Sequence, residues 1–438
     1  MGKWKVPLPV WLTLLGALSL LIYGRAYALG DLREHTTNFV TTFFILFALY
    51  LAAVALILRH ESEPVSAATW LVIILFALAP RLLLLPMKPT LSDDMFRSPG
   101  AQLAFAAIWR VVGGSVTGFK AVFVLAELAG AWLLVRLLRT LNQPPQRVLI
   151  YLWSPLLIFE VAHAGHVDGL MLPLLILALW ARVKERYWLL GLALGLAVLV
   201  KLIPLILLPA LLPPLKMRHK SQQAAPPTKP EGKERLNWRP ALYTLTALGS
   251  VIILAYLPYV LRSGSAIGFL PHYFAENFNM GLARIVFEVA ERYGRSGSTF
   301  ANLIAFGGLV GLSLIFIVRP ASSGKSALIR CVWLIGWFTL FTQNLFPWYL
   351  LWLLPLLACL VEPGRFFGFK LAPMTAWLFF SGLVVFSYLF FIHWRIVPWA
   401  QLAEFAPLYA LLLAGGWFSR NSRGVETLAV HHDRAIYL

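Results

Sequence analysis

Charged residues are scarce in this sequence. They make up 13% of the 438 residues, whereas hydrophobic residues make up 60%. Because a soluble globular domain usually carries about 25% charged residues, this composition excludes an ordinary soluble domain. Apolar runs of about 17 residues or more recur from end to end, and the first of them, 7–24, lacks a clear small-residue cleavage site. The sequence therefore predicts an all-α, polytopic helical membrane protein whose first apolar run is a membrane span.

Acidic residues are fewer than basic ones. The chain has 19 Asp and Glu against 37 Lys and Arg, which gives a formal net charge of +18. The basic residues lie mostly in short loops between apolar runs, which is the positive-inside pattern of membrane proteins. No basic face is interleaved with aromatic residues, as a nucleic-acid site requires, so we expect no nucleic-acid partner.

Cysteines and the common nucleotide-binding motifs are also scarce. The two cysteines, Cys331 and Cys359, both lie in apolar runs, so a disulfide framework is not predicted. Neither a Walker loop nor a glycine-rich dinucleotide fingerprint is present in the sequence. No standard motif therefore supports a nucleotide-sugar donor, and we expect no cofactor.

Apolar segments fill residues 1–418, which we take as one transmembrane domain of about 12 to 14 segments. The predicted segments are 9–29, 38–58, 68–86, 119–138, 148–164, 168–181, 188–200, 203–215, 240–261, 300–318, 328–343, 347–361, 371–391 and 403–418. The pair 188–200 and 203–215 is either two crossings or one broken, re-entrant hairpin. In both cases the chain returns to the side that it left.

The charge of the loops predicts the orientation. When Lys3 and Lys5 are placed in the cytoplasm, the basic loops fall on the same side. These loops are 182–186, 216–239, 319–330 and 365–370. The Pro-, Lys- and Gln-rich loop 216–239 is predicted to be a basic cytoplasmic linker, and residues 419–438 a cytoplasmic tail. The sequence thus predicts a multi-pass protein of the plasma (inner) membrane.

The turns on the opposite side carry the unusual polar residues. A charge within membrane depth costs roughly 2.5–3.5 kcal/mol on insertion scales, so it is usually paired or lines a polar cavity. We therefore expect one extracytoplasmic cavity shared by five segments. They are 90–102, 160–169, the turn at Lys201, the external loop 263–299 and 343–352.

Two adjacent aspartates, Asp93 and Asp94, follow the third apolar run. A carboxylate at a membrane surface can act as a general base toward a sugar hydroxyl. The alternative is a structural role, as a helix N-cap or in an ion pair with Arg97. The segment 100–114 that follows is apolar on one face, which predicts an amphipathic helix in the outer interface.

A second polar group is formed by His163, His166 and Asp168. Their spacing is compatible with a metal site, but one segment without a supporting motif is weak evidence, and we expect no metal. Hydrogen bonding of His166 and Asp168 to a polyol or a phosphate, or to each other, is the preferred interpretation. The ammonium of Lys201 can hold a phosphate, or it can snorkel to the interface.

An aromatic turn contains Trp348, Tyr349 and Trp352. By default such a turn belongs to the aromatic belt at the membrane interface. Aromatic faces also stack on sugars and on isoprenoid chains, and the sequence leaves both interpretations open.

These segments together resemble a known family. The stretches SDDMFR (92–97), IYLWSPLLIFEVAHAGHVDG (150–169), GLAVLVKLIPLILLP (195–209), FNMGLAR (278–284) and FPWYLLWLLPLL (346–357) resemble bacterial polyprenyl-phosphate-sugar-dependent glycosyltransferases. These enzymes are the mannosyltransferase-like group of the GT-C superfamily. The likeness covers roughly residues 70–390 and lies in the order and topology of the motifs.

The resemblance implies a GT-C-like fold and a set of site residues. Asp93 or Asp94 matches the catalytic acid of the family. Arg97, Lys201, His166 and Asp168 match the donor-phosphate and sugar side of the site. The expected binding set is completed by residues in or just before the last two motifs, namely Asn279, Arg284, Gln343, Trp348 and Tyr349.

The implied reaction is transfer of a hexose, often mannose, from polyprenyl phosphate to an acceptor hydroxyl, by direct displacement and without a metal. The expected partners are the polyprenyl-phosphate-sugar donor, a glycan, lipid or glycolipid acceptor, and membrane lipids. One departure from the family pattern is that Arg97 passes directly to Ser98-Pro99-Gly100, so the external segment is shortened. The alternatives are a catalytically degenerate family member and a transporter of a lipid-linked glycan or a small solute.

Overall fold

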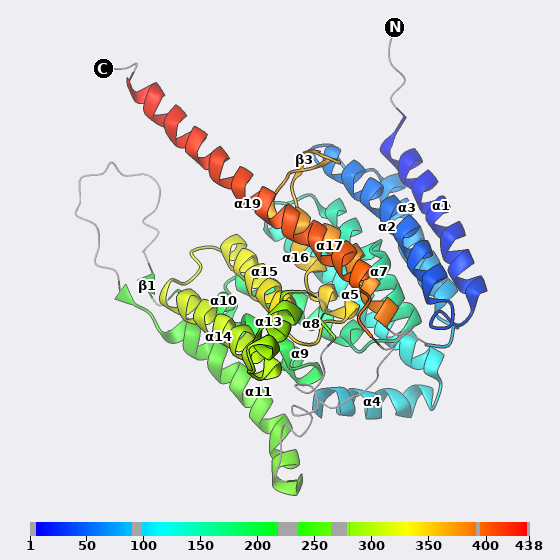
Figure 1. The fold of residues 1–438 in the computed structure, drawn as a ribbon, viewed down its shortest axis with the longest axis horizontal. Coiled ribbons are helices and arrows are strands. Elements are labelled where there is room, and N and C mark those ends of the chain that lie inside the picture. The colour runs from blue at the N-terminus through cyan, green and yellow to red at the C-terminus, as the bar shows by residue number, and fades with distance from the viewer. Residues whose placement is uncertain are drawn as a thin grey trace.

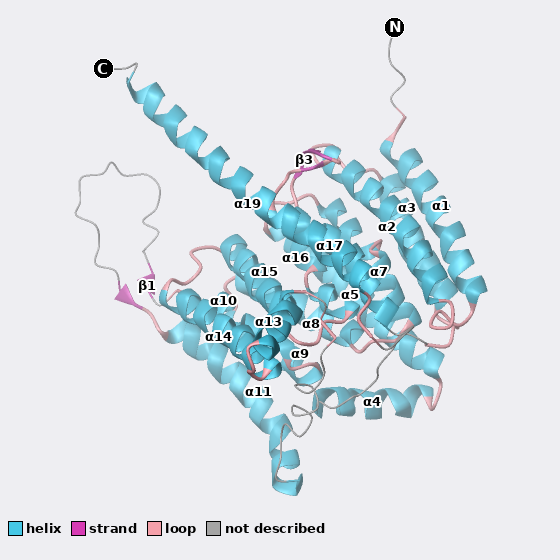
Figure 2. Ribbon diagram, viewed as in Figure 1, coloured by secondary structure: helices cyan, strands magenta, loops and turns pink. Residues whose placement is uncertain are grey.

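The computed structural model describes residues 6–89, 99–214, 216–217, 235–263, 278–279, 281–390 and 395–435. Helices build nearly all of this part of the chain (Figure 2), which confirms the all-α prediction. The N-terminal third contains α1 (Leu8–Leu29), α2 (Thr36–Arg59), α3 (Ala67–Leu84), α4 (Pro99–Val112) and α5 (Val116–Thr140).

The middle of the chain alternates short and longer elements. They are η1 (Pro145–Val148), α6 (Leu149–Leu152), α7 (Pro155–Ile158), the π-helical turn η2 (Phe159–His163), α8 (Asp168–Val183), α9 (Tyr187–Val200), η3 (Ile203–Leu207) and α10 (Leu208–Leu211). Two-residue strands β1 (Lys216–Met217) and β2 (Arg235–Leu236) pair antiparallel. They flank the predicted linker, most of which lies outside the described residues.

The C-terminal half contains the remaining elements. They are α11 (Arg239–Ser263), α13 (Leu282–Arg292), α14 (Gly297–Val318), α15 (Gly324–Phe341), η4 (Pro347–Trp352), α16 (Leu354–Leu360), β3 (Pro363–Phe366), α17 (Pro373–Leu383), η5 (Val384–Leu389) and α19 (Pro398–Ala435). Most of the predicted external loop 263–299 before α13 lies outside the described residues. The last helix, α19, continues through the predicted tail as far as Ala435.

Seven helices of the described chain are long and apolar enough to cross a membrane, so the chain is a multi-pass membrane protein. They are α1, α2, α3, α5, α11, α14 and α15. Three more apolar helical stretches are shorter, at Tyr187–Val200, Pro347–Leu360 and Pro373–Leu389. Since a crossing helix needs about 20 residues, the predicted 12 to 14 segments include pieces that do not cross by themselves. In particular, 188–215 forms α9, η3 and α10, which is the broken arrangement of the two alternatives.

Prolines explain why the middle elements are short. A proline lacks the N–H that a helix interior requires, but it fits the first turn of a helix. Proline stands at the first or second position of η1, α7, η3, α10, η4 and α16. Each of these apolar runs is therefore divided into pieces that change direction, whereas a run without such prolines forms one long helix.

The short pieces lie inside the molecule. Residues 148–163 and 347–361 are buried throughout, including large side chains such as Phe159 and Trp352. Irregular backbone at membrane depth is tolerated only where protein or a polar cavity surrounds it. The long helices α2, α5 and α15 contact this irregular centre and cover it.

The positions of α1, α19 and α4 distinguish two ends of the molecule. In Figure 1, α1 begins and α19 finishes at one end, and α4 lies across the opposite end. The predicted interfacial helix at 100–114 is thus confirmed as a helix, with Leu103, Trp109 and Val111 exposed. The polar residues of the candidate site come from turns between these helices.

Candidate active site

Lys201 follows the last residue of α9 and forms an ion pair with the first residue of α8. Its Nζ lies 2.8 Å from Oδ2 of Asp168, and Nε1 of Trp352 donates to Oδ1 of the same carboxylate at 2.7 Å. Asp168 is buried, whereas Lys201 retains 20% exposure. Asp168 is the first residue of α8, where the helix dipole attracts a carboxylate. Both oxygens of Asp168 are therefore engaged, and the ammonium is oriented with part of its surface open.

Two aromatic rings of η4 lie beside this ammonium. Nζ of Lys201 is 5.4 Å from the ring centroid of Tyr349 and 5.3 Å from that of Trp352. The two rings stack with their centroids 5.0 Å apart. Cation–π attraction in a partly desolvated site contributes up to about 2 kcal/mol. The predicted residues Lys201, Asp168 and Tyr349 thus form one cluster, with Trp352 as a further member.

His166 joins the same region through the neighbouring aromatic residue of η4. Its ring stacks on Trp348 with the centroids 4.2 Å apart. Its Nε2 lies 3.1 Å from Oε2 of Glu160, and the hydroxyl of Tyr388 donates to Oε1 of Glu160 at 2.5 Å. The sequence had pointed to His166 and Trp348, whereas Glu160 and Tyr388 were not in the predicted set. Tyr388 gave no signal because it lies in an apolar run more than two hundred residues away.

Lys120 is a second buried cation that the sequence did not single out. Its Nζ donates to the carbonyl oxygens of Met87, at 2.7 Å, and Leu84, at 3.4 Å. These carbonyls belong to the C-terminal end of α3 and the turn after it, where a cation is favoured by the helix dipole. The stem of Lys120 packs against Gly165, where an added Cβ would lie 3.0 Å from Cγ. Lys120 therefore connects the end of α3 with the turn that carries His166.

Three predicted binding residues have their contacts elsewhere in the protein. Nδ2 of Asn279 donates to the carbonyls of Thr339 and Thr342, and Nε2 of Gln343 donates to Ser298. Arg284 pairs with Glu288 of its own helix at 2.7 Å. Aromatic contacts link this region to the cluster, since the ring of Phe346 lies 5.5 Å from that of Phe278 and stacks on Trp348 at 4.5 Å between centroids.

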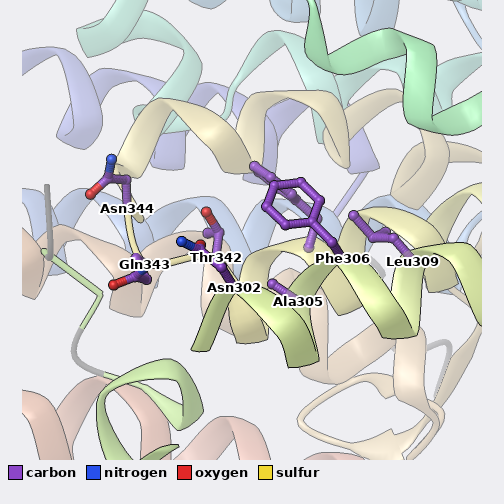
Figure 3. Close-up of a pocket in the computed structure, with 8 residues that line it drawn as sticks. Asn302, Ala305, Phe306, Leu309, Thr342, Gln343 and Asn344 are labelled. Carbon is purple, nitrogen blue, oxygen red and sulfur yellow. The ribbon is translucent and has the colours of Figure 1, made fainter. Parts of the chain in front are cut away.

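A small pocket lies next to these residues, between α14 and the C-terminal end of α15 (Figure 3). Polar side chains form one part of its wall and apolar side chains the other. They are Asn302, Thr342, Gln343 and Asn344, and Ala305, Phe306, Leu309 and Phe338. The ring of Phe338 also lies 5.9 Å from Tyr349 and 6.3 Å from Trp352, so it separates the pocket from the Lys201 cluster.

The predicted catalytic residues Asp93 and Asp94, and Arg97 with them, lie outside the described residues. The described residues on both sides of this stretch contact the region of the cluster. Met87 is held by Lys120, and the backbone of Gly100 packs against Leu199, two residues before Lys201. Among the described residues, no three His, Cys, Asp or Glu side chains are grouped closely enough to hold a metal ion.

Comparison with known proteins identifies relatives of one part of the chain. Residues 98–215 match the family described as alpha-(1->6)-mannopyranosyltransferase, N-terminal domain. GPI mannosyltransferase 1 of Aspergillus fumigatus is 31% identical over 115 residues, which cover 25% of this chain and 27% of that protein. The chain thus matches about a quarter of the length of this curated relative. No solved structure matches the chain.

Proposed function

We propose that the chain is a membrane mannosyltransferase, because residues 98–215 match the family described as alpha-(1->6)-mannopyranosyltransferase, N-terminal domain. Its donor would be a polyprenyl-phosphate-linked mannose, and its acceptor a hydroxyl group of a glycan, lipid or glycolipid. The matched segment includes His166, Asp168 and Lys201, so the cluster and the family relationship fall on the same part of the chain.

The observation that carries this proposal is the ammonium of Lys201, oriented by Asp168 and flanked by Tyr349 and Trp352. A polyprenyl-phosphate sugar is an amphiphile with a single anionic phosphodiester between a sugar and an apolar chain. A partly exposed cation between aromatic faces suits this chemistry, because the cation pairs with the phosphate while the rings contact the sugar or the first isoprene units.

The reaction is a displacement at the anomeric carbon of the donor. The acceptor oxygen forms the new glycosidic bond, and the bond between the anomeric carbon and the phosphate oxygen breaks with its electron pair left on the phosphate. We assign Asp93 or Asp94 as the base that takes the acceptor proton. Lys201 and Arg97 stabilise the charge that grows on the departing phosphate. The contacts of Met87 with Lys120 and of Gly100 with Leu199 support this assignment, because they bring the residues before and after Asp93 and Asp94 in the sequence near the cluster.

The active site is assigned to the extracytoplasmic side of the plasma membrane. The basic loops 182–186 and 319–330 follow α8 and α14, at the ends of these helices that lie away from the cluster residues. By the positive-inside rule these loops are cytoplasmic, which places Lys201 and His166 toward the outside. A lipid-linked donor is suited to this side, where nucleotide sugars are scarce.

Replacement of Lys201 tests the proposal. In membranes supplied with labelled polyprenyl-phosphate mannose, Lys201→Met is expected to lower kcat by about 10²–10³-fold, the usual effect of losing one charge-stabilising donor. Lys370→Met is the matched control, because Lys370 also pairs with a carboxylate at 2.7 Å but is 54% exposed. Transfer by Lys201→Met at the wild-type rate would reject the assignment, and a panel of other polyprenyl-phosphate sugars identifies the hexose.

A further inference from the structure

Three buried side chains from two distant parts of the chain are connected by one hydrogen bond and one ion pair. The hydroxyl of Tyr388 donates to Oε1 of Glu160 at 2.5 Å, and Oε2 of Glu160 lies 3.1 Å from Nε2 of His166. Glu160 and Tyr388 are almost fully buried, at 1% exposure each, whereas His166 retains 5%. An imidazole joined to a buried carboxylate that is itself fixed by a third group is the arrangement by which proteins orient a proton-transferring histidine.

The backbone is shaped to make this arrangement. Phe159–His163 is a π-helical turn, and such turns are frequent at functional sites. Gly165 then adopts a φ of +74°, which a side chain rarely allows, and N–H of His166 donates to the carbonyl of Glu160 at 2.9 Å. The turn thereby folds His166 back over Glu160, and Trp348 closes the other face of the ring.

We propose that Glu160 holds His166 as an imidazolium that protonates the departing phosphate, with Tyr388 as the residue that positions Glu160. This inference rests on the proposed transferase function. The contact between Nε2 of His166 and Oε2 of Glu160, at 3.1 Å, has the length of an ion pair between an imidazolium and a carboxylate. The second N–H of the ring, on Nδ1, makes no ion pair with a described residue and is the one that serves the ligand.

The proton balance of the step is complete. The acceptor loses its hydroxyl proton to the aspartate base as the new carbon–oxygen bond forms. The phosphate oxygen receives the electron pair of the broken bond and, from Nδ1 of His166, a proton. The carrier leaves as a phosphate monoester with one charge neutralised by protonation and the other paired with Lys201. The aspartate then releases its proton to water and His166 takes one up from water, so no oxidant, reductant or further reactant is required.

Other charged and titratable groups lie near the turn that carries this pair. Lys120, Asp31 and His166 all act electrostatically on His163, the second histidine of the turn, whose two ring nitrogens have no hydrogen-bond partner among the described residues. The charged groups of the elements around this turn are Lys120 of α5 and Asp31 before α2, which act on His163, and Asp168 of α8 with Lys201 after α9, which pair with each other. Tyr388 of η5 contacts Glu160 itself. Among the described residues, Glu160 alone forms an ion pair with the imidazole of His166.

The first test measures protonation without any substrate. Hydrogen–deuterium exchange at C2 of each imidazole, followed by tandem mass spectrometry as a function of pH, gives the pH midpoint for His166 in the purified chain. In Glu160→Gln the midpoint is expected to move to lower pH, since the carboxylate that stabilises the imidazolium is gone. Tyr388→Phe, a milder change, is expected to move it in the same direction by less, and the exposed His35 provides an internal reference.

Tyr50→Phe is the matched control for Tyr388→Phe. Tyr50 is also buried, at 2% exposure, and its hydroxyl donates to a backbone carbonyl, that of Ile150, at 2.7 Å. Both variants lose one buried hydrogen bond, so a general loss of packing affects them alike. Only Tyr388→Phe is expected to move the His166 midpoint. An unchanged midpoint in both Glu160→Gln and Tyr388→Phe overturns the proposed role of Glu160.

The second test measures transfer. His166→Gln is expected to lower kcat by about 10²-fold with KM within about twofold, the usual effect of losing one general acid. The basic limb of the pH profile of kcat is expected to move to lower pH in Glu160→Gln and to stay in place in Tyr50→Phe. A moved midpoint with an unmoved basic limb refutes proton delivery by His166. A wild-type chain inactive with every lipid-phosphate sugar instead refutes the proposed function.

Discussion

Asp93 and Asp94 are adjacent carboxylates, and a displacement at one carbon needs one base. We therefore expect Asp93→Asn and Asp94→Asn to differ, with the loss of the base lowering kcat by about 10²–10⁴-fold and the other change having a smaller effect. The assay is transfer from labelled polyprenyl-phosphate mannose in membranes. Glu362→Gln, which removes a carboxylate that pairs with Lys370 and is 47% exposed, is the control and keeps wild-type transfer. Full activity of the double Asn variant would exclude both aspartates as the base.

Arg81 and Glu127 form a buried ion pair between α3 and α5, away from the cluster. Arg81 donates to both carboxylate oxygens, at 2.8 and 3.0 Å, and to the carbonyl of Leu152 at 2.9 Å. Glu127→Gln leaves the guanidinium buried without its counter-ion, which is expected to cost about 3–5 kcal/mol. Glu288→Gln, in an exposed pair with Arg284, is expected to cost only about 0.3–0.5 kcal/mol. Thermal unfolding in detergent compares the two, and equal midpoints would contradict this account.

The sequence predicted part of the cluster and missed another part for a physical reason. Lys201, Asp168, His166 and Trp348 stand next to turns, where a charged or aromatic residue in an apolar chain attracts notice. Lys120, in contrast, lies inside a helix of spanning length, and its partners are backbone carbonyls, which carry no sequence signal. The partnership of distant residues, such as that of Tyr388 with Glu160, depends on how the irregular centre folds and has no local pattern.

At the scale of elements, the apolar runs correctly predicted where helical structure occurs. They did not predict which runs form one unbroken helix and which form several short pieces. The runs that became α2, α5 and α14 contain no proline and form helices of 22 to 25 residues. The runs at 148–164 and 347–361 are as apolar but contain Pro155 and Pro347, and they fold as buried short pieces. Hydropathy is high for both kinds of run because both have apolar surroundings. A proline removes a backbone N–H donor, and this loss decides whether a run forms one continuous helix.

The packing of α9 against α11 depends on a glycine. A Cβ at Gly191 would overlap the carbonyl oxygen of Thr244 on α11, whereas a Cβ at Gly249, also on α11, would meet nothing within 4 Å. Gly191→Ala is therefore expected to force the helices apart and to cost about 1–3 kcal/mol. Gly249→Ala is expected to be neutral or to stabilise α11 by up to about 1 kcal/mol, because alanine is the better helix former. Unfolding of the two variants in detergent provides the measurement, and equal stability would disprove the close contact.

Because α9 leads directly into Lys201, the same variant has a functional consequence. A shift of α9 displaces the ammonium from Asp168 and from the rings of Tyr349 and Trp352. Gly191→Ala is expected to lower transfer more than Gly249→Ala at temperatures at which both variants remain folded. The close contact at Gly191 that packs α9 against α11 thus also sets the position of the Lys201 ammonium.

At the scale of the whole molecule, the orientation in the membrane can be tested at the two ends of α14. Tyr293 and Ser322 flank α14, whose 22 residues extend over about 33 Å, enough to cross the hydrocarbon core. Both are exposed, and the native Cys331 and Cys359 are buried, at 0% and 2% exposure, so they leave little background for thiol labelling. A cysteine placed at either position therefore reports one side of the membrane.

The basic loop 319–330 predicts which side each position occupies. Tyr293→Cys is expected to react with a membrane-impermeant maleimide in intact cells, and Ser322→Cys only after the cells are lysed. The reverse pattern would place the Lys201 cluster in the cytoplasm and remove the main reason for a lipid-linked donor. Labelling of both in intact cells would instead contradict α14 as a crossing helix. Because the loop charge, the length of α14 and the location of the cluster are independent observations, agreement in this one experiment ties the proposed chemistry to the side of the membrane on which it operates.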